Sequence, residues 1–126
     1  MGCVLIFATS VYAHKIEPNW FEVTNIDVNL PKLDRAFNGY RIVQITDLHA
    51  GAGIDRHQLE KVIEAVNAQN PDLVVITGDH ISRIPRQHLE LFDTLTKLHP
   101  RDLTISILGN HDVFNDPAPV RTAIQR

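Results

Sequence analysis

Cysteine is nearly absent from the sequence, and basic residues are too few and too scattered to form a patch. The single cysteine, Cys3, excludes an intrachain disulfide. The 12 Lys and Arg are outnumbered by 15 Asp and Glu, giving a net charge of −3. This balance argues against generic electrostatic binding to nucleic acid or to an anionic membrane as the main function, so we expect no nucleic acid as a stable partner.

A hydrophobic run of membrane-spanning length is also missing. The apolar stretch at residues 1–13, MGCVLIFATSVYA, is shorter than the roughly 20 residues that a spanning helix needs. It lacks the basic start of a signal peptide, although its last three residues loosely suit a cleavage site. Two interpretations stay open: an ordinary first strand or tail, or the remnant of a membrane anchor or export signal. The second would make the protein membrane-associated or exported rather than cytoplasmic.

Internal repeats and low-complexity linkers are absent, and glycine and proline are few, at 6 and 7 residues. With 44% apolar and 21% charged residues, the composition is that of a globular protein. The length of 126 residues allows at most one ordinary domain with a modest core. We therefore divide the chain into the apolar segment 1–13 and one domain, residues 14–126.

Apolar patterning predicts an α/β fold. Runs rich in apolar residues at 40–46, 72–78 and 103–109 predict three core strands, the second of them buried on both faces. Between them lie two stripes at helical spacing. The first, after the capping residue Asp55, is Leu59, Val62, Ile63 and Val66; the second is Leu89, Phe92, Leu95 and Leu98. The order β-α-β-α-β favours a parallel sheet with right-handed crossovers. Partial alternation over 20–31 predicts one bulged strand or two short ones.

Each predicted core strand ends in a short polar loop. The sequence reads ITDLHAG after the first strand, TGDH after the second and LGNHD after the third. In a parallel sheet these ends lie along one edge, where open α/β sheets bind ligands. The side chains that we expect to converge there are Asp47, His49, Asp79, Asn110 and His111.

This set of side chains has the chemistry of a metal site. Imidazole suits Zn and Fe, whereas carboxylate and amide oxygens suit Mg and Mn, so a mixed set fits Mn, Fe or Zn better than Ca. If the Asp47–His49 segment is extended, both side chains point the same way and reach one cation. One such motif is usually a loop cap. Three at successive strand ends crowd so many ionisable groups that a compensating cation is the better interpretation.

The same blocks resemble the signature of the calcineurin-like metallophosphoesterase superfamily: D-x-H, then G-D, then G-N-H-D/E. They stand at residues 47–49, 78–79 and 109–112. The flanks GYRIVQITDLHAG and PDLVVITGDHI are similar to a bacterial phosphodiesterase branch that often has an N-terminal anchor or export signal. The resemblance implies the N-terminal half of a four-layer α/β/β/α sandwich. It also implies hydrolysis of phosphomonoesters or phosphodiesters by hydroxide held between two divalent ions, Mn, Fe or Zn.

The resemblance also implies a role for each matching residue. The implied metal ligands are Asp47, His49, Asp79 and Asn110, with Asp79 bridging the two ions and Asn110 also reaching a substrate oxygen. His111 would be the general acid or transition-state stabiliser at the leaving oxygen, and Asp112 would orient His111.

Two further blocks of the superfamily, a lone His and G-H-x-H, have no counterpart. Only VFNDPAPVRTAIQR follows Asp112. We therefore expect an incomplete domain, the N-terminal part of a longer enzyme, with little or no catalysis by itself. The alternative is a non-catalytic metal-binding fragment, or a half-domain completed by another chain. Among the other histidines, only His80 lies close enough in sequence to help, and an ordinary loop role is favoured for it.

A dinucleotide-binding loop is the rival interpretation of HAGAGIDR. Gly51 and Gly53 follow a strand and precede a helix, as such a loop requires. However, Arg56 replaces the third glycine, and Asp47 would repel a pyrophosphate. The metal site is therefore the favoured hypothesis.

Overall fold

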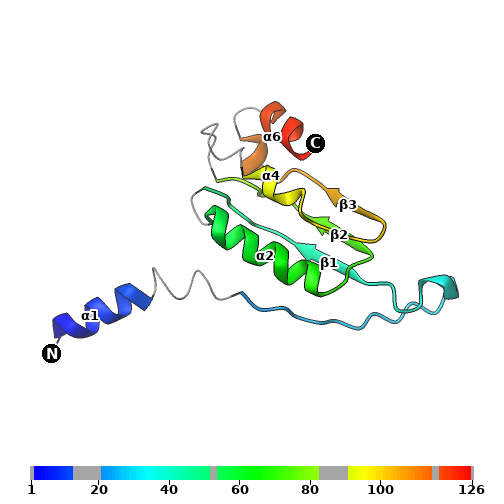
Figure 1. Cartoon of the computed structure of the whole chain (residues 1–126), viewed down its shortest axis with the longest axis horizontal. Coiled ribbons are helices and arrows are strands. Elements are labelled where there is room, and N and C mark those ends of the chain that lie inside the picture. The colour runs from blue at the N-terminus through cyan, green and yellow to red at the C-terminus, as the bar shows by residue number, and fades with distance from the viewer. Residues whose placement is uncertain (1, 13–20, 52–53, 83–90, 115–116, 126) are drawn as a thin grey trace.

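The computed structural model describes residues 2–12, 21–51, 54–82, 91–114 and 117–125, and the fold is described for these alone. Three strands form one parallel sheet in the order β1-β2-β3 (Figure 1): β1, Ile42–Ile45; β2, Leu73–Ile76; and β3, Leu103–Ser106. The predicted α/β class and its parallel sheet are confirmed. All three C-terminal strand ends therefore meet at one edge.

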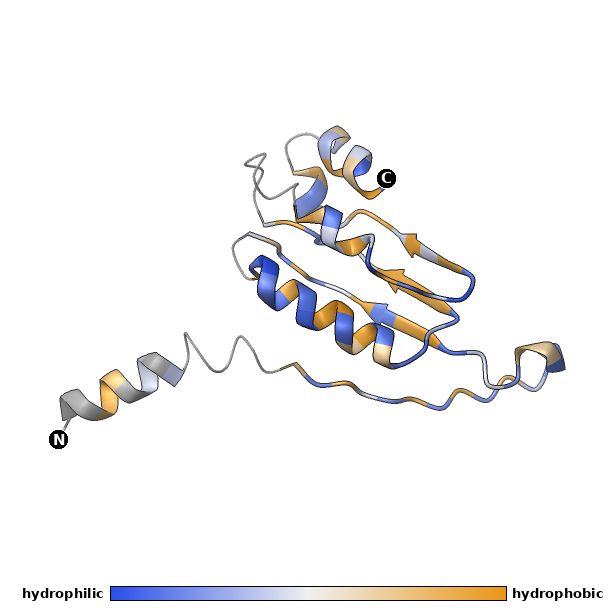
Figure 2. Cartoon of the chain, in the orientation of Figure 1, coloured by the Kyte–Doolittle hydropathy of each residue, from blue (hydrophilic) through white to orange (hydrophobic). Residues whose placement is uncertain are grey.

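Helix α2, Arg56–Ala68, connects β1 to β2 and begins as the sequence predicts. The side chain of Asp55 accepts a hydrogen bond from the Gln58 N–H at 2.8 Å, and the Gln58 side chain accepts from the Asp55 N–H at 2.9 Å. This reciprocal pair satisfies two backbone donors that the first turn would otherwise leave free. The buried residues of α2 are Leu59, Ile63 and Val66, and Figure 2 shows hydrophobic and hydrophilic residues alternating along this helix.

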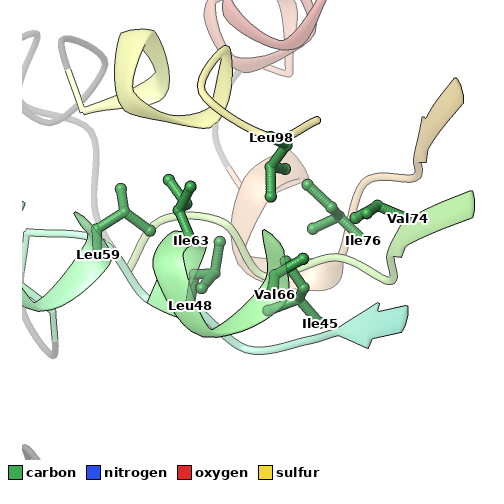
Figure 3. Packing of buried hydrophobic residues seen from close by; sticks show 8 residues of the cluster. All are labelled: Ile45, Leu48, Leu59, Ile63, Val66, Val74, Ile76 and Leu98. Atoms are coloured by element: carbon green, nitrogen blue, oxygen red, sulfur yellow. The ribbon is translucent and has the colours of Figure 1, made fainter. Parts of the chain in front are cut away.

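The main core lies between α2 and one face of the sheet. Figure 3 shows its members, which come from β1, its following loop, α2, β2 and the turn before β3: Ile45, Leu48, Leu59, Ile63, Val66, Val74, Ile76 and Leu98. All are buried: the members from β1, β2 and α2 are the inward-facing residues of those elements, and Leu48 and Leu98 lie in the adjoining loops. The core thus fixes the loop after β1 through Leu48, directly between two predicted ligands.

The opposite face of the sheet is less covered than the sequence suggests. Leu73 and Val75 of β2 are half-buried, and Ile42, Leu103 and Ile105 are exposed. The prediction that β2 is buried on both faces is therefore correct for one face only. Sheet faces of this kind are usually covered by another layer.

A second cluster lies around the loop after β2. Helix α4, Phe92–Leu95, contributes Phe92, and helix α6, Ala118–Ile124, contributes Val120; both pack with Ala50 and Ile81. Helix α4 is shorter than the predicted stripe, whose first member, Leu89, lies outside the described residues. Residues of α4 and α6 thus pack against the loops that follow β1 and β2.

The N-terminal third differs from the prediction. Residues 21–30 form no strand, because a strand needs a hydrogen-bonding neighbour and no segment among the described residues pairs with them. Their apolar side chains are exposed. Trp20 lies outside the described residues. A short 3-10 helix, η3, Arg35–Phe37, follows. Residues Gly2–Val11 form helix α1 rather than a strand. Among the described residues, no helix has both the length and the apolar character needed to cross a membrane.

Candidate metal centre

The loops after β1 and β2 turn sharply at the residues predicted to bind metal. Asp47, His49 and Asp79 have positive φ angles of 54°, 44° and 50°. Asp and His tolerate this left-handed region better than most residues, but it still stores strain, which clusters at functional sites. Residues 47–49 are therefore not extended, so the condition under which both side chains would point the same way is not met. Hydrogen bonds hold the turns in place: the His49 N–H donates to the Asp79 carbonyl at 2.9 Å.

Three side chains from three different strand ends meet at this edge. His49, Asp79 and His111 each offer a ligand atom, and these atoms lie within 4.8 Å of one another. The imidazole rings of His49 and His111 meet edge to face, with centroids 4.9 Å apart. His49 and Asp79 are half-buried and His111 is exposed, so the site opens to solvent. The convergence expected of these three residues is present.

Asp47 and Asn110, the other two residues expected at this edge, adjoin the cluster in the sequence. One Asp47 carboxylate oxygen is 3.6 Å from His49 Nε2, so the two side chains approach each other despite the turned backbone. Asn110 is the first residue of helix α5, Asn110–Val113, directly before His111. The His111 N–H donates to Asp79 Oδ1 at 3.0 Å, which ties the start of α5 to the middle ligand.

Ser82 orients the imidazole of His49. Its hydroxyl lies 3.1 Å from Nδ1 of His49. With Nδ1 engaged, Nε2 is the nitrogen left for a cation, and it is also the one that faces Asp47. Sequence reasoning missed Ser82, because a serine three residues after an aspartate carries no signal of its own.

Two glycines allow the loops after β2 and β3 to touch through their backbones. A Cβ built on Gly78 would lie 2.7 Å from the Gly109 Cα, and one built on Gly109 would lie 2.2 Å from Asp79 Oδ1. Real Cβ atoms do not approach so closely, so each position requires glycine. This contact brings Asp79 beside α5.

Asp112 is fully buried, and its carboxylate binds the neighbouring loop. It accepts hydrogen bonds from the N–H groups of Gly109 at 2.9 Å, His80 at 2.9 Å and Ile81 at 3.2 Å. Burial alone would raise the pKa of Asp112, but hydrogen bonds from the His80 side chain and the Gly109 N–H outweigh it and hold the pKa below its ordinary value. Among these described hydrogen bonds, none reaches His111, the partner predicted from the resemblance.

The partner of Asp112 is His80. Its Nδ1 lies 2.8 Å from Asp112 Oδ2, and its Nε2 lies 2.7 Å from the hydroxyl of Ser106. The ring is 1% exposed and packs on Phe92 at 5.7 Å between centroids. Both nitrogens are engaged away from the cluster, so His80 does not add a metal ligand. One signal was available: Ser106 shares the inward face of the sheet with Ile45 and Ile76, and a polar residue there calls for a buried partner.

The donor set fits a divalent cation. The imidazole of His49 and the carboxylates of Asp47 and Asp79 suit Mn, Fe or Zn, and the second imidazole, that of His111, lies beside them on the solvent-exposed side. Asp47 and Asp79 bring two carboxylates to strained backbone positions, where a cation would compensate their charge.

Comparison with known proteins agrees with this chemistry. The family model described as "Calcineurin-like phosphoesterase" matches residues 40–124, which include all three strand ends. The chain is 39% identical over 105 residues to UDP-2,3-diacylglucosamine pyrophosphatase LpxG of Chlamydia trachomatis, covering 82% of this chain and 32% of that protein.

Two other similar proteins are metallophosphoesterases described as uncharacterized. Identity is 35% over 94 residues with Cj0846 of Campylobacter jejuni, covering 75% of this chain and 24% of that protein. It is 33% over 103 residues with YkuE of Bacillus subtilis, covering 80% and 36% respectively. The chain thus spans about a third or less of the length of these relatives.

Proposed function

The chain belongs to the calcineurin-like phosphoesterase family, and we propose that the protein hydrolyses phosphate esters at a site that holds two divalent metal ions. The observation that supports this most is the approach of His49, Asp79 and His111, from three strand ends, to within 4.8 Å. Bound divalent ions would polarise the phosphoryl group and make water more acidic. The proposed ions are Mn, Fe or Zn, which the mixed donor set suits.

In this proposal each side chain has one task. Asp47 and His49 would hold the first ion, with Ser82 engaging Nδ1 of His49 and leaving Nε2 as the ligand atom. Asp79 would contribute to both ions, and Asn110 would contribute its amide oxygen to the second ion and to the substrate. His111, exposed at the mouth of the site, donates a proton to the leaving oxygen.

The experiment is hydrolysis of bis-(p-nitrophenyl) phosphate by a version of the protein extended beyond residue 126 to the length of its relatives. We expect turnover that requires Mn²⁺ and is lost on chelation. Cleavage of UDP-2,3-diacylglucosamine at its pyrophosphate is assayed in parallel, because the Chlamydia relative is named for that substrate. Absence of turnover of either substrate, with metal bound, would remove the enzyme proposal in favour of a non-catalytic metal-binding module.

Helix α1 supports a second, separate proposal: association of the N-terminus with a lipid surface. Its Leu5, Ile6 and Phe7 side chains are 65%, 71% and 71% exposed, and adjacent exposed apolar side chains favour burial in a membrane interface. We expect the chain to float with phosphatidylcholine vesicles in a density gradient. A variant with serine at all three positions should remain at the bottom. Equal flotation of both would contradict the proposal.

A further inference from the structure

A buried hydrogen-bonded chain runs beneath the candidate metal centre. It joins Ser106 at the end of β3, His80 after β2, and Asp112 of α5 through two side-chain contacts of 2.7 and 2.8 Å. His80 and Asp112 are 1% and 0% exposed. Polar groups buried this deeply are costly unless every one is satisfied, and here both ring nitrogens have partners.

The arrangement fixes the tautomer of His80. Asp112 accepts from its surroundings through both oxygens, so the ring must place its proton on Nδ1, toward Asp112 Oδ2. In the neutral ring, Nε2 then accepts from the Ser106 hydroxyl. Phe92 packs on the ring and prevents it from turning. The ring is thus held by two hydrogen bonds and one packing contact, each from a different element.

The chain of contacts reaches the ligands through the backbone. Asp112 Oδ1 accepts the N–H groups of His80 and Ile81, while Oδ2 accepts that of Gly109. Helix α5, which carries Asn110 and His111, is thereby fastened to the loop that carries Asp79. The His80 carbonyl in turn accepts the Ala50 N–H at 2.8 Å, next to His49.

We propose that His80, through its hydrogen bond to Asp112, is a positioning residue that sets the distance between His111 and Asp79 at the metal centre. The inference rests on the proposed function in so far as it concerns a bound metal. The effect of His80 on the position of α5 can be measured in the metal-free chain. His80 contacts no ion in this account. It acts by preventing α5 from shifting away from the loop after β2.

The experiment compares His80→Ala with His80→Asn, whose side-chain amide can still donate to Asp112. In the metal-free chain, we expect His80→Ala to speed hydrogen exchange of the Gly109 and His111 N–H groups by about tenfold or more relative to the rest of the sheet. Mn²⁺ affinity, measured by calorimetry, should fall by about tenfold. His80→Asn should restore most of both.

Val66→Ala is the matched control. Val66 is buried in the main core near the end of α2, apart from the cluster that packs around His80, so its truncation lowers stability without touching the chain of hydrogen bonds. We expect its Mn²⁺ affinity and its exchange pattern at Gly109 and His111 to match the unmodified chain.

The outcomes separate the two proposals. If the unmodified chain binds no Mn²⁺ but His80→Ala loosens Gly109 and His111 selectively, the proposed function fails and the positioning stands. If His80→Ala behaves as Val66→Ala does, or if His80→Asn is as impaired as His80→Ala, the positioning role is overturned. If His80→Ala does not fold, His80→Asn decides. The proposal then requires that hydrogen exchange of the Gly109 N–H in His80→Asn match that in the unmodified chain, and faster exchange would contradict it.

Discussion

Replacing Gly109 by alanine is expected to destabilise the fold by about 3 kcal/mol and to abolish stoichiometric metal binding. The added Cβ would lie 2.2 Å from Asp79 Oδ1 and 2.3 Å from the Asp79 backbone nitrogen. The second of these atoms cannot rotate away, so the two loops must separate. Because His111 follows on the same loop, its N–H would lose the Asp79 carboxylate. Thermal or denaturant unfolding and Mn²⁺ calorimetry measure the two effects.

Gly39→Ala provides the control for this substitution. Gly39 has a positive φ of 75°, but a Cβ built there meets nothing within 4 Å. Alanine at this position should cost about 1 kcal/mol through backbone conformation alone and leave metal binding intact. If Gly109→Ala destabilised no more than Gly39→Ala, the close approach of the two loops would not exist in solution.

Changing Asp79 to asparagine is expected to weaken Mn²⁺ binding by about a hundredfold or more while leaving the fold intact. Asparagine keeps an oxygen that can accept the His111 N–H, so the contact between the loops survives. What it removes is the negative charge placed among two imidazoles. Calorimetry measures the affinity, and in the extended protein the same change should remove hydrolysis.

Asp93→Asn is the control for charge. Asp93 lies on α4 and is exposed, so its neutralisation changes the net charge equally without altering the metal centre. An Asp79→Asn variant that bound Mn²⁺ as tightly as Asp93→Asn would show that Asp79 is no ligand.

Periodicity in the sequence was sufficient to predict the sheet and α2. β1, β2 and β3 lie inside the predicted runs, and Asp55 caps α2, because strand alternation and helix capping are local properties. Residues 21–30 show the limit of this reasoning. Their alternation is typical of a strand, but pairing depends on a neighbour that periodicity cannot supply.

The candidate ligands were likewise predictable from topology, whereas the hydrogen bonds that hold their loops together were not. Because the three strands are parallel, the loops that carry His49, Asp79 and His111 lie at one edge of the sheet, whatever the exact conformation of each loop. The partner of Asp112 depends on how two loops 32 residues apart align. The resemblance implied His111 as the partner, whereas the hydrogen bonds of the described residues join Asp112 to His80. Such contacts arise from packing in three dimensions, and only the inward position of Ser106 pointed to them in advance.

A Mn²⁺ titration of the unmodified chain, followed through its histidine ring signals by nuclear magnetic resonance, tests most directly whether three strand ends share a cation. Paramagnetic broadening should appear first at His49 and His111 at substoichiometric Mn²⁺. His99, which precedes β3 at the opposite edge of the sheet, should stay sharp. Equal broadening of the His49, His111 and His99 rings, or no broadening until Mn²⁺ is in large excess, would contradict a shared cation at the strand ends.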